Sequence, residues 1–287
     1  MSGFKAVIFD AYGTLLRNDD LVLVPRQIVA DHGLSARLDE VWRAWSDLYF
    51  EATQLAPFRT LREIEELILP RVLRQFDVAA DAAPYVELFF RVTTRIELYP
   101  ETLDVLNALG HVRTAILSNA DHEHLAAWNV TLPVEFILIS ETVRAYKPHR
   151  LVFQRALEQL GLEPHEVLHV GDSDVDEVKG AKEAGLRVAW VNRDGRARRP
   201  DVPAPDFEIR DLSQVPRLLR LEQSHVGWRR APARRLTSGK RPPTLAANPR
   251  TRGAISDPAG HSRRPSAFRR PACPSHSSGA TRSASSP

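Results

Sequence analysis

The chain has 287 residues, of which 43% are hydrophobic and 26% are charged, with a formal net charge of +3. This composition is that of a globular protein with one large domain, or a core domain with an insert, and it excludes collagen-like and wholly disordered chains. The single cysteine, Cys273, excludes an internal disulfide and a multi-cysteine metal site. Because the sequence contains neither an apolar run of about 18 residues nor a signal-like segment, we expect a cytoplasmic protein without membrane contact.

Short β-branched runs alternate with helical stretches along the first 221 residues. We predict strands at 5–9, 113–117, 134–139, 167–170, 187–191 and 207–209, and later helices at about 101–109, 148–160, 181–184 and 213–221. Between the first two strands, residues from about 17 to 97 repeat apolar side chains every three or four positions, as Trp42, Trp45 and Tyr49 do, which is typical of amphipathic helices. The alternation predicts an α/β fold with a parallel sheet covered on both faces and an all-helical insert after the first strand.

Residues 222–287 differ in charge from the rest of the chain. From position 224 onward they hold 13 of the 39 Lys and Arg residues but one acidic residue, Asp257, so the basic balance comes from this tail. The tail is rich in Pro and Ser and lacks aliphatic periodicity, which predicts disorder. Since only Trp228 and Phe268 interleave with its arginines, we expect no nucleic-acid partner, and a solvated appendage or a gene-end artefact explains the tail better.

Polar residues follow four of the predicted strands, with Asp10 after the first, Ser118 after the second, Lys147 after the third and Asp172 after the fourth. In an open parallel sheet, ligands bind outside the carboxyl ends of the strands, so these loops should meet. An Asp can act as a nucleophile, a hydroxyl and an ammonium can hold an anionic group, and an acidic loop can bind Mg²⁺. Each loop alone has an ordinary alternative as a turn, a helix cap or a solvated charge. Their combination in this order predicts a site.

In this combination the sequence resembles the haloacid dehalogenase-like hydrolase superfamily over about residues 4–221, in the branch with a helical cap inserted after the first motif. The similar segments are 7–15, 116–119, 146–148 and 170–176. The resemblance implies a Rossmann-like parallel-sheet core at 1–16 and 98–221 and an α-helical cap domain at 17–97. It also implies a small anionic metabolite as substrate.

The resemblance also implies roles for individual residues. Asp10 would be the nucleophile that forms an aspartyl intermediate, with Thr14, Ser118 and Lys147 as further catalytic residues. Substrate binding would fall to Tyr12, Arg43 and Asn119. Mg²⁺ would be held by Asp10, the Tyr12 carbonyl and Asp172, with Asp176 and Glu177 in support. Four histidines, His122, His124, His165 and His169, are interpreted as ordinary residues.

Two departures from the family pattern point in opposite directions. Family phosphatases usually carry a second Asp two residues after the nucleophile, where this chain has Tyr12, a residue shared with L-2-haloacid dehalogenases. Trp42-Arg43 and Asn192-Arg193 also resemble those dehalogenases. Such dehalogenases need no metal and have a small neutral residue where this chain has Asp172. The fourth motif therefore resembles the Mg²⁺-dependent phosphatases instead.

Three functions are compatible with these residues. The first is a Mg²⁺-dependent phosphohydrolase acting on a small phosphorylated metabolite. The second is a metal-independent L-2-haloacid dehalogenase in which Arg43 and Ser118 bind the substrate. The third is a weakly catalytic protein of the same superfamily that binds a ligand or partner. The sequence favours the first over the other two.

Overall fold

The computed structural model describes residues 3–219, and the predicted disordered tail lies outside this range. Six strands form one sheet: β1 (Ala6–Phe9), β2 (Arg113–Ser118), β3 (Phe136–Ile139), β4 (Val167–Gly171), β5 (Arg187–Val191) and β6 (Phe207–Ile209). Their order is β3-β2-β1-β4-β5-β6, and every pairing is parallel. The predicted α/β fold with a parallel sheet is confirmed.

The α-helices are α1 (Leu23–Asp31), α2 (Leu38–Gln54), α3 (Leu61–Gln75), α4 (Ala83–Thr93), α5 (Thr102–Ala108), α6 (His122–Ala126), α7 (Ser140–Val143), α8 (Arg150–Leu160) and α9 (Gly180–Glu183). Short 3-10 segments lie at Asp19–Val22, Ser35–Arg37, Pro164–Glu166 and Leu212–Gln214, and a π-helical segment, η4, spans Asp174–Lys179. Among these described residues, no helix has the length and apolar character that crossing a membrane requires.

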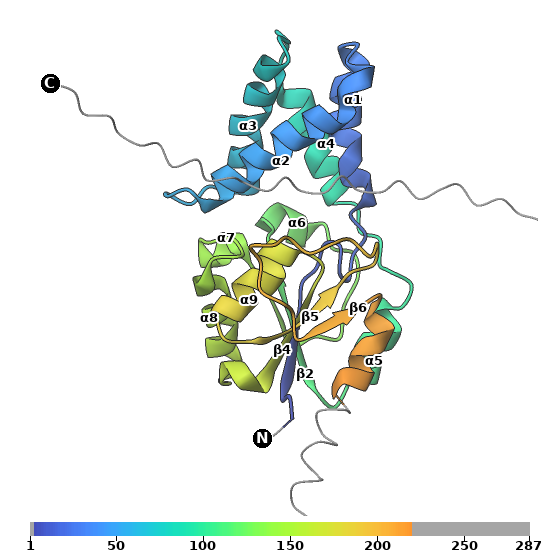
Figure 1. Ribbon diagram of the computed structural model, residues 1–287, viewed down its shortest axis with the longest axis vertical. Helices are drawn as coiled ribbons and strands as arrows, with labels where there is room; N and C mark the ends of the chain where they lie inside the picture. Colours follow the sequence, from blue (N-terminus) through green and yellow to red (C-terminus); the bar gives the residue numbers. More distant parts are fainter. Residues whose placement is uncertain (1–2, 220–287) are drawn as a thin grey trace, which may run out of the picture.

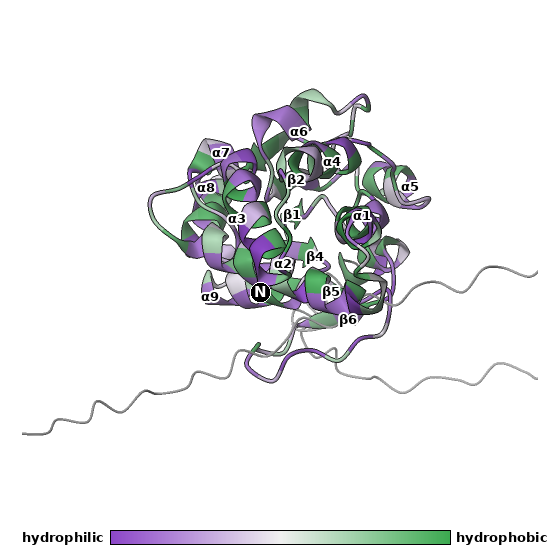
Figure 2. Cartoon of the chain, turned by 90° about the horizontal axis from the view of Figure 1, so that it is seen from above, coloured by the Kyte–Doolittle hydropathy of each residue, from purple (hydrophilic) through white to green (hydrophobic). Residues whose placement is uncertain are grey.

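Helices cover both faces of the sheet (Figure 1). The side chains of each strand point alternately to one face and to the other, so both faces can be buried. In β1, Val7 and Phe9 pack on the face that includes α5, whereas Ala6 and Ile8 pack on the face that includes α8 and α9. All four side chains of β1 are buried, as expected for a central parallel strand. In Figure 2 the surrounding helices carry both green and purple residues, which fits helices with one buried face.

Helices α1 to α4 share a hydrophobic cluster of their own above the carboxyl ends of the strands (Figure 1). The chain enters this helical group through Arg17 and leaves it through Glu97, whose carbonyl accepts a hydrogen bond from the Arg17 N–H (2.7 Å). Leu16 and Leu98 form an antiparallel bridge beside it. The two connections therefore run side by side. We call α1 to α4 the cap and the sheet with its own helices the core.

One carboxylate from the core lies at the start of cap helix α3. Asp121, which precedes α6, accepts hydrogen bonds from the backbone N–H groups of Leu61 (2.9 Å) and Arg62 (3.1 Å). The first N–H groups of a helix have no partner within the helix, and they carry partial positive charge. A carboxylate of the core thus binds the N-terminus of a helix that lies some 60 residues away in sequence. This contact fixes one end of α3 above the sheet.

Candidate active site

A cavity of about 370 Å³ lies between the cap and the carboxyl ends of the strands. From the core it is lined by Asp10, Tyr12, Ser118, Asn119, Lys147 and the acidic segment 172–177. From the cap it is lined largely by apolar and aromatic side chains, among them Trp42, Trp45, Tyr49, Phe50, Leu61 and Phe89. The predicted convergence of the four loops is therefore present in the structure, at the edge where parallel sheets bind ligands.

Asp10 and Lys147 form a buried ion pair at the centre of the core wall. The Lys147 Nζ donates to Asp10 Oδ1 (2.7 Å) and to the Leu117 carbonyl (2.8 Å), and it pairs with Glu177 Oε1 (2.8 Å). An ammonium has three N–H donors, and these three contacts use all of them. Burial lowers the pKa of Lys147, but Asp10 and Glu177 outweigh it and raise the pKa above its ordinary value. Lys147 is therefore a fixed positive charge.

Three buried oxygens remain without a hydrogen-bond partner at the cavity. They are Asp10 Oδ2, Ser118 Oγ and Asp176 Oδ1. Burial raises the pKa of Asp10 to about 7, against the opposing attraction of Lys147. Since buried polar atoms are nearly always satisfied, these oxygens mark the place where a ligand completes the hydrogen bonding. Asp10 Oδ2 has the chemistry of a nucleophile, and Ser118 Oγ is a hydroxyl that can hold an anion.

Glu177 connects Lys147 to His169, to which the sequence assigned no role in the site. Its Oε2 is hydrogen-bonded to Nε2 of His169, which lies fully buried on β4. Burial raises the pKa of Glu177, but Lys147 and His169 together hold it below its ordinary value. A side chain at Gly171 would overlap Glu177, so the glycine gives this carboxylate its room. The sequence signal for this contact is a histidine on a strand, three residues before Asp172, and the interpretation of His169 as an ordinary residue misses its bond to Glu177.

Tyr12 lies against the cap side of the nucleophile. Its hydroxyl accepts a hydrogen bond from Trp128 Nε1 (3.2 Å), and its ring meets His124 edge to face at 6.0 Å. Burial raises the pKa of Tyr12 to about 12 and lowers that of His124 to about 4. At neutral pH both side chains are uncharged. His124 lines the cavity, which the sequence did not indicate.

Of the predicted substrate-binding residues, Arg43 lies outside the cavity and Asn119 lines it with its side chain bonded to the protein backbone. Arg43 is exposed and does not line the cavity, because Trp42, Trp45, Ser46 and Tyr49 occupy the cavity face of α2 and Arg43 lies about 100° around the helix from Trp42. The expected contact of Arg43 with substrate is therefore wrong for this arrangement. Asn119 lines the cavity, but its side chain holds the Lys147 backbone, accepting from N–H (2.8 Å) and donating to C=O (3.3 Å).

The remaining predicted residues surround the nucleophile. Thr14 is fully buried with its hydroxyl unpartnered and does not line the cavity, whereas Asp176 and Glu177 do. Burial, reinforced by Glu177, raises the pKa of Asp176 well above its ordinary value. A side chain at Gly13 would overlap the Asp172 carboxylate, and the positive φ of 95° also favours glycine there. Asp172 is thus packed directly against the turn that follows the nucleophile.

The carboxylates of Asp10 and Asp172 and the backbone carbonyl of Tyr12 have the right chemistry for Mg²⁺, which prefers carboxylate and carbonyl donors. Asp10 Oδ2 is buried and unpartnered, and Asp172 lies against the 12–14 turn. Asp10, the Tyr12 carbonyl and Asp172 would hold the ion. Within residues 3–219, however, no three His, Cys, Asp or Glu side chains come together as a metal cluster. The set is therefore a partial site made of two carboxylates and one carbonyl.

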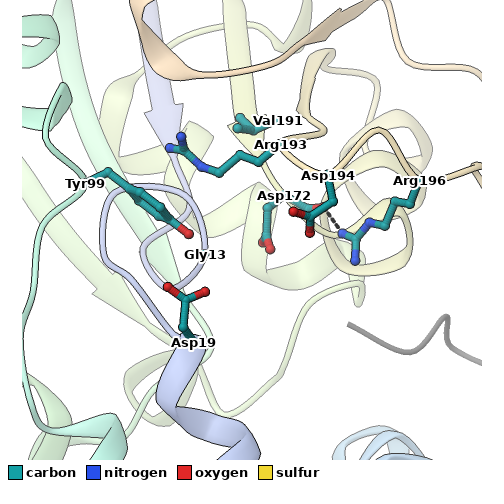
Figure 3. Close-up of a pocket in the computed structure, with 8 residues that line it drawn as sticks. All are labelled: Gly13, Asp19, Tyr99, Asp172, Val191, Arg193, Asp194 and Arg196. Atoms are coloured by element: carbon teal, nitrogen blue, oxygen red, sulfur yellow. Dashed lines mark hydrogen bonds between the residues drawn. The ribbon is translucent and has the colours of Figure 1, made fainter. Parts of the chain in front are cut away.

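A second, smaller cavity lies behind the nucleophile turn (Figure 3). It is lined by Gly13, Asp19, Tyr99, Asp172, Val191, Arg193, Asp194 and Arg196. The Arg193 guanidinium lies 3.6 Å from the centre of the Tyr99 ring and is paired with Glu101 at 2.7 Å. Arg196 and Asp172 line both cavities, so they form the boundary between them.

Comparison with known proteins identifies the family. The profile of haloacid dehalogenase-like hydrolases matches residues 4–185, and the chain belongs to this family of hydrolases. A phosphoserine phosphatase of Thermus thermophilus is 31% identical over 191 residues, covering 62% of this chain and 72% of the relative. (S)-2-haloacid dehalogenase 1 of a Pseudomonas species is 26% identical, covering 76% and 98%.

The solved structures agree with this assignment. An L-2-haloacid dehalogenase of Xanthobacter autotrophicus is similar with a TM-score of 0.63 and 26% identity, covering 76% of this chain and 98% of that protein. The relatives thus include both phosphatases and dehalogenases. Together they support a haloacid dehalogenase-like hydrolase whose core has an α/β fold.

Proposed function

We propose that this protein is a hydrolase that displaces halide from short 2-haloacids, with Asp10 as the nucleophile. The carrying observation is the pair of residues at positions 10 and 12. Asp10 Oδ2 faces the cavity without a partner, and the residue two positions later is a phenol with a pKa of about 12. A halide leaves without a proton, whereas the alcohol of a phosphate ester needs an acid. This proposal reverses the order that the sequence favoured.

The reaction follows from the positions of these groups. Asp10 Oδ2 attacks the carbon that bears the halogen, the carbon–halogen bond breaks, and the halide departs with the electron pair. Water then adds to the carbonyl carbon of the Asp10 ester, which releases a 2-hydroxy acid, a proton and the regenerated carboxylate. Lys147 favours the ionised form of Asp10 against the effect of burial and orients the carboxylate before the attack, and Ser118 Oγ lines the cavity, where it can donate to an anionic group of the substrate.

The cap side of the cavity supports the same proposal. Trp42, Trp45 and Phe89 present aromatic surface to the nucleophile, and the described cap residues contribute Arg17 alone as a cation, at the base of the cap. An apolar wall suits the carbon and halogen of a short haloacid better than the charged ester group of a phosphorylated metabolite. Several similar proteins are named 2-haloacid dehalogenases, which adds weight to this substrate class.

The direct test measures chloride release from L-2-chloropropionate, and phosphate release from acetyl phosphate and para-nitrophenyl phosphate, each with Mg²⁺ and with EDTA. We expect chloride release that EDTA leaves unchanged and that Asp10→Asn abolishes. A single turnover with excess enzyme in H₂¹⁸O should place the label in Asp10, and none in the first product. Label found directly in the 2-hydroxy acid would show attack by water on the substrate and would contradict the aspartyl ester.

A second candidate, a Mg²⁺-dependent phosphohydrolase, is favoured by one observation. Asp172 lies against the 12–14 turn beside Asp10, and the two carboxylates with the Tyr12 carbonyl are suitable Mg²⁺ donors. When bound, the ion would neutralise negative charge on a phosphoryl group. The Thermus relative named phosphoserine phosphatase agrees with this candidate. Mg²⁺-dependent phosphate release without chloride release would select it over the dehalogenase.

Tyr12→Asp separates the two candidates further. A carboxyl at this position supplies a proton donor for a poor leaving group, and general acid catalysis contributes on the order of 10²–10⁴-fold. If the protein is a phosphohydrolase in which Tyr12 slows the reaction, the variant should hydrolyse alkyl phosphates faster, while its rate of acetyl phosphate hydrolysis should change little. No gain on alkyl phosphates, together with loss of chloride release, would support the dehalogenase.

A further inference from the structure

An anionic substrate meets an unusual amount of negative charge in the main cavity. Four carboxyl groups of the segment after β4, Asp172, Asp174, Asp176 and Glu177, line its wall in addition to the nucleophile. A carboxylate that enters this space needs a cation close by, because like charges repel strongly where water is excluded. The cations that line the cavity are Arg17, Lys147, Arg196 and Arg199.

Three of these four cations are committed to neighbouring carboxylates. Lys147 uses its three donors on Asp10, Glu177 and a carbonyl. Arg17 pairs with Asp19 at 2.7 Å and with Glu97 at 3.5 Å. Arg199 has a looser contact, with its Nε 3.9 Å from Asp174 Oδ2 and without a hydrogen-bond partner. The charges of Lys147 and Arg17 are therefore largely balanced before a substrate arrives, and that of Arg199 is partly balanced by Asp174.

Arg196 differs from these three. Its guanidinium donates through one NH₂ group to the backbone carbonyl of Asp172, a neutral acceptor, as drawn by the dashed line in Figure 3. Within residues 3–219 it forms no ion pair with a carboxylate. A guanidinium has five N–H donors, so donors remain for a ligand. Arg196 is partly buried and lines the main cavity as well as the smaller one.

The backbone at Arg196 is held in place by a buried side chain. Asn192, 2% exposed, accepts from the Arg196 N–H through Oδ1 (2.9 Å) and donates to the Arg196 carbonyl through Nδ2 (2.9 Å). The same Nδ2 also donates to Glu208 on β6 (2.6 Å). Asn192 follows β5 and Asp172 follows β4, so Arg196 is tied to the edge of the sheet through its backbone and through its guanidinium. The contacts of Asn192 and Asp172 therefore determine the position of the Arg196 side chain.

We propose that Arg196 binds the carboxylate of the haloacid and so restricts the substrate to short 2-halocarboxylates. The proposal rests on the proposed function, and it gives to a core loop the role that the sequence assigned to Arg43 in the cap. A guanidinium can meet a carboxylate with two parallel hydrogen bonds, which orients as well as binds it. Because Arg196 and Asp10 line the same cavity, a haloacid held by the guanidinium shares that cavity with the unpartnered Asp10 Oδ2.

The first experiment compares kinetic constants in the full-length protein. Arg196→Gln should raise KM for L-2-chloropropionate at least tenfold, with kcat changed about threefold or less, and Arg196→Lys should recover part of the loss. Arg198→Gln is the matched control, because Arg198 lies in the same loop, donates to the Arg199 carbonyl (3.0 Å) and does not line the cavity. Equal KM values for Arg196→Gln and Arg198→Gln would overturn the proposal.

The second experiment measures binding without turnover. Asp10→Asn protein, alone and combined with Arg196→Gln, is titrated with L-2-chloropropionate and with inorganic phosphate by calorimetry. We expect at least tenfold weaker binding of L-2-chloropropionate in the double variant. Unchanged binding of that acid, no binding in Asp10→Asn itself, or loss confined to phosphate would each overturn the proposal. If the double variant binds the acid more weakly but the wild type releases no chloride, the proposed function fails and the assignment of Arg196 stands.

Discussion

Glu177 on the core side and Glu65 on the cap side are both fully buried, yet their pKa values move in opposite directions. Lys147 and His169 hold the pKa of Glu177 below its ordinary value despite burial. Glu65, inside the cap cluster, receives one hydrogen bond, from Trp45 Nε1 (2.8 Å), and burial raises its pKa to about 8. Glu177 keeps its charge because it is paired, whereas Glu65 stays protonated at neutral pH because it has no cationic partner.

This difference separates the two tasks of the site. The core holds charges in fixed positions, which is what a displacement by a carboxylate requires. The cap contributes shape through Trp42, Trp45 and Phe89, and its buried carboxyl carries no charge at neutral pH. Changes in the core should therefore alter the rate strongly, and changes in the cap should alter stability or substrate choice.

The largest effect is expected from the nucleophile. Asp10→Asn should lower chloride release more than about 10³-fold, because no other group at this position can form the ester. Chloride release by initial rates, with circular dichroism to check folding, measures it. Asp104→Asn, an exposed change on α5, should retain the wild-type rate. Activity above a tenth of wild type in Asp10→Asn would remove Asp10 from the mechanism.

Removing the shared cation should reduce stability. Lys147→Met leaves Asp10 and Glu177 buried without their common partner, and breaking a buried pair in this way costs about 3–5 kcal/mol in the free energy of unfolding. Urea unfolding at pH 7.5 measures the change. Adding Glu177→Gln should restore part of the loss, since one uncompensated charge is removed. A loss below about 1 kcal/mol would mean that the pair does not stabilise the fold.

The protonated carboxyl in the cap gives a pH-dependent effect. Folding raises the pKa of Glu65 from 4.5 to about 8, so between these values the unfolded chain loses a proton that the folded chain keeps, and stability falls as the pH rises. Glu65→Gln keeps an oxygen for Trp45 and cannot ionise. Its free energy of unfolding should match wild type near pH 5 and exceed it by on the order of a few kcal/mol at pH 8. A difference independent of pH would contradict the protonated state.

The smallest effect is expected from Arg43. Because Arg43 is exposed on α2 and lies outside the cavity lining, Arg43→Ala should leave KM for L-2-chloropropionate within about twofold and the free energy of unfolding within about 0.5 kcal/mol. Steady-state kinetics and urea unfolding give both numbers. A tenfold rise in KM would show that the arginine turns inward when substrate binds, and that the cap shares in recognition.

Much of the fold could be predicted from the sequence. The β-branched runs gave all six strands within two residues at each end, and the order of the four polar loops placed Asp10, Ser118, Lys147 and Asp172 at one sheet edge. These features depend on local periodicity and on a general property of parallel sheets. They need no knowledge of side-chain orientation.

The errors concern which way a side chain points and what it touches. Trp42 and Arg43 are adjacent in sequence, but the helix places Trp42 in the cavity wall and Arg43 outside it. His169 and Glu177 are eight residues apart in the sequence, and the chain beyond β4 folds back so that their side chains form a hydrogen bond. Periodicity cannot reveal such contacts, since they depend on tertiary packing.

The paired connections between cap and core have a consequence for how such a protein diversifies. Because the Arg17 N–H is bonded to the Glu97 carbonyl and Leu16 bridges Leu98, the 80 or so residues between them leave and return at nearly one point. A helical module attached in this way can be exchanged for another without moving Asp10 or the sheet. New substrate preferences can therefore be acquired by grafting, while the chemistry beneath is inherited unchanged.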